Sequence, residues 1–255
     1  MSDYLGQFVW YELMTSDLKG AEAFYTAVLG WTSQDTGMNP PYVLVKVDGV
    51  QVGGLMPIPE RAAGAAPVWF GYVAVPDVDA YAAKISQAGG SVHRAPDDIP
   101  GVGRFAMVAD PGGAVFVLFK GDSAAPPPQP APGTPGLVGW RELLAGDGEV
   151  AFEFYSKLFG WTEAQVMDMG PMGAYRLFAA GGEAIGAMMT KPSAMPLPPH
   201  WRFYFRVEDI DAGLARVKAH GGQITMGPER VPTGDWIVHA MDPQGAFFAL
   251  VGPRK

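Results

Sequence analysis

The chain contains no cysteine, and this absence removes whole classes of chemistry. Without thiols there is no disulfide framework, no thiolate nucleophile and no zinc or iron–sulfur site with cysteine ligands. Charged residues are also scarce, at 17% of 255 residues, whereas 48% are hydrophobic, which is typical of a packed globular protein rather than a disordered one. No apolar run is long enough to span a bilayer.

Positive charge is in short supply as well. Lysine and arginine number 18 against 26 aspartates and glutamates, and the net charge at pH 7 is −8. An acidic surface repels phosphate backbones and anionic lipids, so we expect neither nucleic acid nor a membrane as a partner. The first residues, MSDYLGQ, lack the basic and apolar stretches of a secretory signal, and we expect a cytoplasmic protein.

The second half of the chain repeats the first. At an offset of 130 residues, Trp10–Leu13 resembles Trp140–Leu143, and Gly30–Thr32 is identical to Gly160–Thr162. After an insertion of two residues the similarity resumes at an offset of 132. The later matches are Trp69 with Trp201, Asp77–Ala80 with Asp209–Ala212, Gly89-Gly90 with Gly221-Gly222, and Asp110-Pro111 with Asp242-Pro243. So many matches in register indicate an internal duplication.

A proline-rich segment lies between the two halves. Residues 121–136 read GDSAAPPPQPAPGTPG, and proline at this density opposes helix and sheet and favours an extended spacer. We therefore predict a first domain over residues 1–120, a linker over residues 121–136 and a second domain over residues 137–255.

Each half divides again into two segments of similar pattern. The first begins with a strand at Phe8–Met14, followed by a helix that Asp17 caps and Gly30 ends. The pattern restarts at Val68–Val75, with a second helix capped by Asp77. Further strands are expected at residues 42–47, 52–56, 105–109 and 114–119. The sequence thus predicts an α+β protein with four βαβββ segments.

These motifs, in this order and present twice, resemble the glyoxalase/bleomycin-resistance/extradiol-dioxygenase superfamily, also called vicinal oxygen chelate. The resemblance rests on a helix ending Phe-Tyr…Leu-Gly-Trp, on Val-Pro-Asp-Val-Asp-Ala before a helix and Gly-Gly, and on Asp-Pro-Gly-Gly-Ala before the last strand. It implies two tandem domains, each a curved mixed sheet around a cup with helices outside. One chain would then be a monomer that forms an internal pseudo-dimer, and a homodimer is the alternative.

The resemblance also implies a divalent metal in each cup. The positions of its ligands fall on Trp10, Phe70 and Val117 in the first half and on Trp140, Arg202 and Ala249 in the second. Indole rings and aliphatic carbons offer no suitable lone pair, and an arginine repels a cation. We therefore expect no metal in either cup, and no other cofactor.

Alternation of side chains along the strands brings further residues to the same faces. The candidate ligand-binding residues are Trp10, Phe70, Tyr72 and Val117 in the first half, and Trp140, Arg202, Tyr204, Arg206, His239 and Ala249 in the second. The two arginines predict that the second half binds the more polar or anionic ligand. His239 reads either as a hydrogen-bonded structural residue or as a ligand.

Two glutamates, Glu12 and Glu142, are the candidate catalytic residues. A carboxylate among aromatic residues needs a donor or a raised pKa, so each is interpreted as a binding-site acid or general base. The alternative is a structural ion pair, for example of Glu142 with Arg202 or Arg206. Trp31 and Trp161 follow helix ends and are expected in the core.

Four functions are open at this point, and one of them is a purely structural or interaction role in which the cups are filled by their own side chains. The residues favour a protein that binds a small aromatic or amphipathic molecule in metal-free cups. The first alternative is a metal-dependent lyase, isomerase or dioxygenase of the same superfamily with shifted ligands such as Glu12, Glu142 and His239. The second alternative is metal-free acid–base catalysis by either glutamate, so the sequence leaves open whether the protein is an enzyme.

Overall fold

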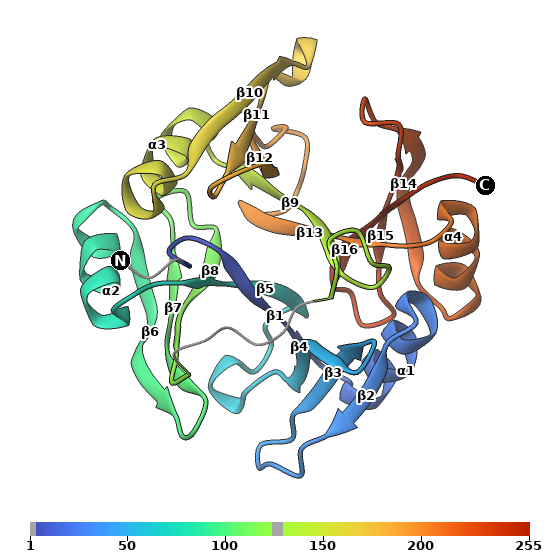
Figure 1. The fold of residues 1–255 in the computed structure, drawn as a ribbon, viewed down its shortest axis with the longest axis horizontal. Helices are drawn as coiled ribbons and strands as arrows, with labels where there is room; N and C mark the ends of the chain where they lie inside the picture. Colours follow the sequence, from blue (N-terminus) through green and yellow to red (C-terminus); the bar gives the residue numbers. More distant parts are fainter. Residues whose placement is uncertain (1–3, 124–129) are drawn as a thin grey trace. The chain divides into compact units, whose positions relative to one another are not determined.

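The structure is a computed structural model that describes residues 4–123 and 130–255. The first half contains β1 (Phe8–Thr15), α1 (Leu18–Leu29), β2 (Thr32–Asp35), β3 (Val43–Val47), β4 (Val50–Pro57), β5 (Val68–Ala74), α2 (Val78–Gln87), β6 (Ser91–Ile99), β7 (Gly103–Ala109) and β8 (Val115–Gly121) (Figure 1). The second half contains β9 (Val138–Ala145), α3 (Gly148–Phe159), β10 (Thr162–Asp168), β11 (Ala174–Ala179), β12 (Ala184–Thr190), β13 (His200–Arg206), α4 (Ile210–Ala219), β14 (Gln223–Arg230), β15 (Trp236–Met241) and β16 (Phe247–Gly252).

The predicted α+β fold with four βαβββ segments is confirmed. The strands form two eight-stranded mixed sheets, in the orders β2-β3-β4-β1-β5-β8-β7-β6 and β10-β11-β12-β9-β13-β16-β15-β14. The first strand of each segment runs parallel to the last one and antiparallel pairs make up the remainder of the segment. The two orders are the same once the second half is laid on the first.

The helix ends follow the caps that the sequence predicts. Asp17 accepts a hydrogen bond from the Gly20 amide (3.0 Å) and Asp77 accepts one from the Ala80 amide (2.9 Å). Gly30 takes a left-handed conformation with φ of 73°, which ends α1. None of the helices in the described ranges combines the length and the apolar character needed to cross a membrane.

The outermost strands were not assigned from the sequence. β2, β6, β10 and β14 lie at the ends of the two sheet orders, and most of their residues are exposed. None of the residues of these four strands is fully buried, so they lack the clear alternation of buried apolar and exposed polar residues that identifies the inner strands.

The chain divides into two compact units that do not follow the two halves. Unit 1 comprises Met1–Val9, Phe70–Pro127 and Arg141–Trp201, and unit 2 comprises Trp10–Trp69, Pro128–Trp140 and Arg202–Lys255. Each unit combines one βαβββ segment of each half: α2 lies beside α3 in unit 1, and α1 lies beside α4 in unit 2 (Figure 1). Domain boundaries at residues 120 and 137 stay a prediction, and residues 124–129 of the predicted linker lie outside the described residues.

A chain of three buried side chains lies inside unit 2. The Trp69 Nε1 group donates to the Tyr25 hydroxyl (2.9 Å), which in turn donates to Oδ2 of Asp242 (3.0 Å). Burial, and then the charge of Asp242, raises the pKa of Tyr25 well above its usual value, so the phenol keeps the proton that it donates. Burial also raises the pKa of Asp242.

The same chain recurs in unit 1. Trp201 donates to Tyr155 (3.1 Å), and Tyr155 donates to Oδ2 of Asp110 (3.2 Å). In both units the tyrosine comes from the Phe-Tyr motif of one half, and the aspartate comes from the Asp-Pro turn of the other half. The motifs that carry the family resemblance are therefore residues that hold two βαβββ segments together.

The expected core positions of Trp31 and Trp161 are confirmed. They are 5% and 2% exposed, and their indole N–H groups donate to the carbonyl oxygens of Gly136 and Gly6, each at 2.9 Å. Trp31 thus connects the residues before β9 to the core of unit 2, and Trp161 connects the residues before β1 to the core of unit 1.

Candidate functional site

Strand β13 separates its side chains onto two faces. Trp201, Phe203 and Phe205 point to one face and are 5%, 1% and 1% exposed, as expected for core residues. Arg202, Tyr204 and Arg206 point to the opposite face because side chains alternate along a strand. The sequence HWRFYFR therefore places two arginines and a tyrosine in one row.

The central contact of this row is made with β15. Nη1 of Arg202 lies 3.0 Å from Nδ1 of His239 and 3.4 Å from Nε2, and the Tyr204 hydroxyl lies 2.8 Å from Nε2. Arginine can only donate, so the shorter contact makes Nδ1 the acceptor, and the neutral ring carries its proton on Nε2 and donates it to Tyr204. Burial, and then the Arg202 charge, lowers the pKa of His239 to about 3.

The second arginine has a carboxylate partner. Nη2 of Arg206 lies 3.1 Å from Oδ2 of Asp235, and both side chains retain about a quarter of their exposure, at 28% and 26%. The Arg206 side chain also passes over Gly139, where an added Cβ would lie 2.7 Å from its Cγ atom. Arg206 thus has a partner, Asp235, that the sequence did not indicate, and the ion pair of Glu142 with Arg202 or Arg206 stays a prediction.

An apolar cluster adjoins these polar groups. Tyr204, Ala249 and Val251 are buried together, and Trp140 and Ile237 pack against them. The strand register places Ala249 opposite both Tyr204 and His239. We call Arg202, Tyr204, Arg206, Asp235 and His239 the second-half polar cluster.

In the first half, Glu12 belongs to a smaller group. The Trp10 indole donates to the Tyr42 hydroxyl (3.0 Å), which donates to Oε2 of Glu12 (2.9 Å). Glu12 is 5% exposed, and a buried carboxylate needs a hydrogen-bond donor. The Tyr42 hydroxyl is that donor. Burial, and then Glu12, raises the pKa of Tyr42 well above its usual value.

The second half has an equivalent pair in unit 1. The Tyr175 hydroxyl donates to Oε1 of Glu142 (3.1 Å), and Glu142 is 6% exposed. The registers of β1 with β4 and β9 with β12 put Gly54 and Ala187 opposite the two glutamates, so Tyr42 and Tyr175 occupy equivalent positions. The Glu–Tyr pair is therefore duplicated with the fold.

The remaining first-half candidates form an apolar row. Phe70, Tyr72 and Val117 are 8%, 6% and 1% exposed, and Tyr72 lies opposite Val117 in the parallel pair of β5 and β8. The Tyr72 ring also contacts the Phe119 ring edge-on, with 6.0 Å between centroids. This row has none of the charged groups found at the matching positions of β13 and β15.

The candidate residues fall into four groups within the units. Unit 2 holds Trp10 with Glu12, and separately Trp140, Arg202, Tyr204, Arg206, His239 and Ala249; unit 1 holds Phe70, Tyr72 and Val117, and separately Glu142. Tyr42, Tyr175 and Asp235 join these groups but escaped sequence reasoning. The two tyrosines match at an offset of 133, a signal that a full alignment of the halves would have shown, whereas Asp235 has glycine as its counterpart, Gly103.

The metal site that the superfamily implies does not fit these residues. The Trp10 indole nitrogen is a donor already used by Tyr42, and Phe70 and Ala249 offer only carbon. Arg202 places a positive charge where a cation would have to bind. Across residues 4–123 and 130–255, no group of three or more histidine, aspartate or glutamate side chains gathers to hold a metal ion.

The shifted ligand set finds no support either. Both ring nitrogens of His239 already have partners: the Tyr204 hydroxyl lies 2.8 Å from Nε2, and the Arg202 guanidinium lies 3.0 Å from Nδ1. A metal at this nitrogen would have to displace the arginine and overcome its charge.

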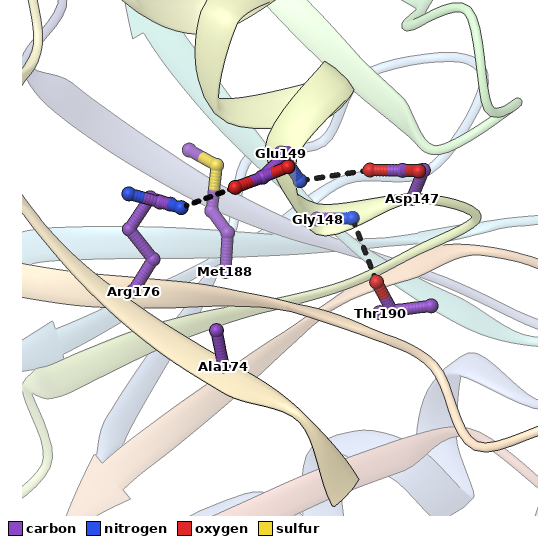
Figure 2. Close-up of a pocket in the computed structure, with 7 residues that line it drawn as sticks. All are labelled: Asp147, Gly148, Glu149, Ala174, Arg176, Met188 and Thr190. Carbon is purple, nitrogen blue, oxygen red and sulfur yellow. Dashed lines mark hydrogen bonds and ion pairs between the residues drawn. The ribbon is translucent and has the colours of Figure 1, made fainter. Parts of the chain in front are cut away.

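A separate cavity of about 190 Å³ lies at the start of α3 (Figure 2). Its polar residues are joined to each other: Arg176 bonds to Glu149 (3.1 Å), Asp147 caps the helix, and Thr190 accepts from the Gly148 amide (3.0 Å). None of the predicted site residues lines it, and we assign it no ligand.

Known proteins share both the sequence pattern and the fold. The family model of the Glyoxalase/Bleomycin resistance protein/Dioxygenase superfamily matches residues 7–118 and 138–250. CFP32 of Mycobacterium tuberculosis, which carries the provisional name of a glyoxylase, is 34% identical over 249 residues, 96% of this chain and 94% of that protein. The anthracycline biosynthesis protein DauV of Streptomyces sp. (strain C5) is 30% identical over 272 residues, 98% of this chain and 94% of that protein.

Solved structures support the same fold. The Mn(II)-bound glyoxalase from Novosphingobium aromaticivorans superposes with a TM-score of 0.68 at 19% identity, over 99% of this chain and 83% of that chain. The 2,2',3-trihydroxybiphenyl 1,2-dioxygenase from Sphingomonas wittichii strain RW1 gives 0.70 at 16% identity, over 97% and 90%. With two matches of the family model along its length, the chain belongs to the glyoxalase/bleomycin resistance protein/dioxygenase superfamily.

Proposed function

We propose that this protein binds a small aromatic or amphipathic molecule, and that it does so without a metal. The observation that carries the proposal is the set of residues at the superfamily's metal positions. Trp10, Phe70, Val117, Trp140, Arg202 and Ala249 supply rings, aliphatic carbon and a guanidinium, which suit an organic ligand rather than a cation.

The surroundings of these residues support the same reading. In the second half, Trp140, Tyr204 and Ile237 form an apolar wall, and Arg202 and His239 place polar groups beside it. Small-molecule sites commonly combine a largely apolar lining with a few fixed polar groups. The names of DauV and its relative DnrV refer to anthracyclines, whose fused aromatic rings belong to the proposed ligand class.

A screen for ligands tests the proposal. Melting temperature and tryptophan fluorescence would be followed across a library of aromatic and aliphatic small molecules. A ligand at about 100 times its Kd stabilises the folded state by about 2.7 kcal/mol. For a chain of this size that raises Tm by roughly 5–10 °C. Trp140→Ala should weaken the response to second-half ligands, and a library in which no compound shifts Tm or fluorescence would contradict the proposal.

Metal analysis tests the second part separately. The purified protein would be analysed by elemental mass spectrometry before and after incubation with Ni, Zn, Mn and Fe salts. We expect far less than one metal ion per chain and an unchanged Tm. One bound ion per half, with a raised Tm, would instead support the metal-dependent alternative.

A second function, proton transfer by a glutamate without a metal, is favoured by the duplicated Glu–Tyr pair. A buried carboxylate held by a phenol, as in Glu12 with Tyr42, is placed to take a proton from an acidic C–H or O–H group of a ligand. For any ligand from the screen, NMR would follow exchange of its acidic protons with deuterium. Glu12→Gln or Glu142→Gln should abolish exchange and preserve binding, whereas exchange at the same rate in both variants would exclude this function.

A further inference from the structure

We infer that the hairpin of β10 and β11 (Figure 1) binds a soft monovalent metal ion, copper(I), through the sulfur atoms of Met167, Met169 and Met172. This site goes beyond the proposed function, because the superfamily's metal positions lie on inner strands and none of the three methionines occupies one. The chain has 13 methionines in 255 residues, yet three of them fall within the six residues MDMGPM at positions 167–172. Composition alone does not explain this concentration of thioethers.

The backbone of the hairpin brings the three side chains together. Met167 is paired with Tyr175 of β11. The amide of Met169 continues this ladder by donating to the Gly173 carbonyl (2.9 Å), so Met167 and Met169, two residues apart, project from the same face. The amide of Met172 donates to the Met169 carbonyl (3.3 Å) in a 3-10 turn, where side chains three residues apart eclipse one another. All three thioethers therefore project from one end of the hairpin.

The turn that carries these side chains is held by its own hydrogen bonds. The Gly173 amide donates to the Gly170 carbonyl (3.0 Å), and the Gly170 amide donates to Oδ1 of Asp168 (2.9 Å). Asp168 also sets one negative charge between Met167 and Met169 in the sequence, which favours a cation at this place. A metal ion would therefore meet a formed backbone and would have to order only the flexible thioether side chains.

The exposure of these methionines makes their sulfur atoms accessible. Met169 and Met172 are 37% and 51% exposed, and Met167 is half-buried. Single apolar residues on a surface are ordinary, but a group of large ones in contact with water indicates a binding role. An ion held by side chains at a turn needs ligand atoms rather than a preformed cavity.

The chemistry of sulfur selects the ion. A thioether is a soft, neutral ligand that suits copper(I), whereas magnesium and manganese favour oxygen, and zinc favours thiolate, imidazole or carboxylate. The chain has no cysteine, so methionine is its only source of soft sulfur ligands. The loop of the first half between β2 and β3, residues 36–42, contains one methionine, Met38, where the second half offers three. We therefore expect the site in the second half alone.

Silver(I) nitrate in chloride-free buffer is the first probe, because silver(I) shares the charge and softness of copper(I) and keeps its oxidation state. The full chain, labelled with carbon-13 at the methionine methyl groups, would be titrated and followed by NMR and calorimetry. We expect the signals of Met167, Met169 and Met172 to shift together and to saturate at one ion, while the Met38 signal stays in place. Copper(I), kept reduced by ascorbate without oxygen, should shift the same three signals, and zinc(II) should shift none of them.

Leucine variants test the ligands one at a time, because leucine removes the sulfur and nearly conserves the volume. Met169→Leu and Met172→Leu should each weaken silver(I) binding by about tenfold or more, since loss of even an outer-shell partner commonly costs about 10–100-fold in metal affinity. The matched control is Met38→Leu, at a residue that is 53% exposed, and it should leave the affinity unchanged. Melting temperatures of all variants show whether the fold is preserved. Shifts of the three signals at different silver concentrations, or wild-type affinity in Met169→Leu, would overturn the inference.

Discussion

The two halves share a framework but differ at matching positions of the candidate sites. Where β5 and β7 carry Phe70 and Met107, β13 and β15 carry Arg202 and His239. The second pair is joined by a hydrogen bond of 3.0 Å. The change from an apolar to a polar pair thus involves both members, because an arginine buried beside a methionine would lose the acceptor that His239 supplies.

A second pair of positions shows the same rule. Ala74 and Gly103 in the first half correspond to Arg206 and Asp235 in the second, and the latter two form an ion pair at 3.1 Å. At these positions the polar residues of the second half therefore occur as hydrogen-bonded pairs. The comparison teaches that the divergence of the duplicated sites is constrained by hydrogen bonding, as expected where burial makes an unsatisfied polar group expensive.

The largest effect is expected from placing the first-half residue in the second half. His239→Met removes an acceptor of the charged Arg202 and should lower the free energy of unfolding by about 1.5–3 kcal/mol. The double variant Arg202→Phe/His239→Met recreates the first-half pair and should recover most of that loss. Urea denaturation of the two single variants and the double variant measures the coupling, and strictly additive losses would show that the two residues did not change as a pair.

The next largest effect is expected at the buried Trp–Tyr–Asp chains, which both units contain. Asn in place of Asp110 keeps an oxygen for the Ala114 amide but turns an N–H group toward the Tyr155 hydroxyl, so the proton that this hydroxyl now donates to Oδ2 of Asp110 would lose its acceptor. We expect Asp110→Asn to cost about 1–3 kcal/mol. Asp242→Asn should cost a similar amount, since its chain has the same geometry, and thermal or urea unfolding that spares one of the two would break the equivalence of the framework.

The same aspartates predict a dependence of stability on pH. Burial raises the pKa of Asp110 and of Asp242, so the folded protein binds protons more tightly there than the unfolded chain does. Stability from these groups should therefore decrease as the pH rises from the unfolded value, about 3.9, through the folded pKa. Urea unfolding at a series of pH values should show this decrease in the wild type and a weaker one in each Asp→Asn variant; identical profiles would contradict it.

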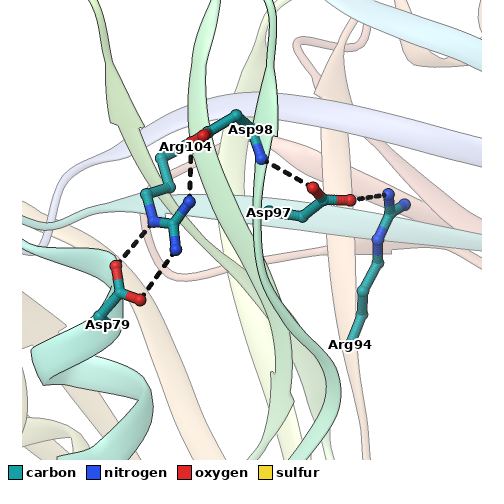
Figure 3. A network of polar contacts seen from close by, with 5 residues as sticks. All are labelled: Asp79, Arg94, Asp97, Asp98 and Arg104. Atoms are coloured by element: carbon teal, nitrogen blue, oxygen red, sulfur yellow. Dashed lines mark hydrogen bonds and ion pairs between the residues drawn. The ribbon is translucent and has the colours of Figure 1, made fainter.

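The smallest effect is expected at the surface, where equivalent positions of the two halves carry different contacts. Arg104 bonds to Asp79 at 2.6 Å and to Asp98 at 2.8 Å, and Arg94 pairs nearby with Asp97 at 2.7 Å (Figure 3). In the second half Trp236 takes the place of Arg104. There the Arg254 guanidinium lies 4.7 Å from the centre of the Trp236 ring and bonds to Asp211, which is the counterpart of Asp79.

Arg104→Gln should change Tm only slightly, and less at high salt, because exposed ion pairs contribute little and are screened. The hydrogen bonds from Arg104 lower the pKa of Asp79, so any contribution is present above the unfolded pKa and is lost as the pH falls through the folded one. Melting curves at low and high salt measure this. A large decrease in Tm that is the same at low and high salt would contradict this prediction and show that the ion pairs contribute substantially to stability.

Much of the fold could be predicted from the sequence because its helix caps and apolar strand patterns are local signals, and each of them occurs in both halves. Asp17 and Gly30 mark the ends of α1 through a cap and a left-handed turn, and buried strands such as β8 show continuous apolar character. The outer strands escaped because exposed edges have no such pattern. Trp31 and Trp161 were placed correctly in the core because burial of a large aromatic ring contributes strongly to packing.

The candidate site could be predicted only in part. Alternation along β13 correctly put Arg202, Tyr204 and Arg206 on one face, but it could not say which partner each would meet. Asp235 became the partner of Arg206, and Tyr42 became the donor to Glu12, through strand pairing between residues far apart in the chain. Such distances depend on register, which a single strand does not contain.

The sequence by itself thus determined the duplication and the four βαβββ segments, since these depend on repeats, caps and side-chain periodicity. Only the tertiary structure decided how the segments combine into compact units. It also showed that the repeated Phe-Tyr and Asp-Pro motifs serve packing through Tyr25–Asp242 and Tyr155–Asp110. The physical reason is that each of these hydrogen bonds joins a donor in one segment to an acceptor in another. Whether the two meet in a buried place depends on how both segments pack, and the sequence of one segment does not specify this.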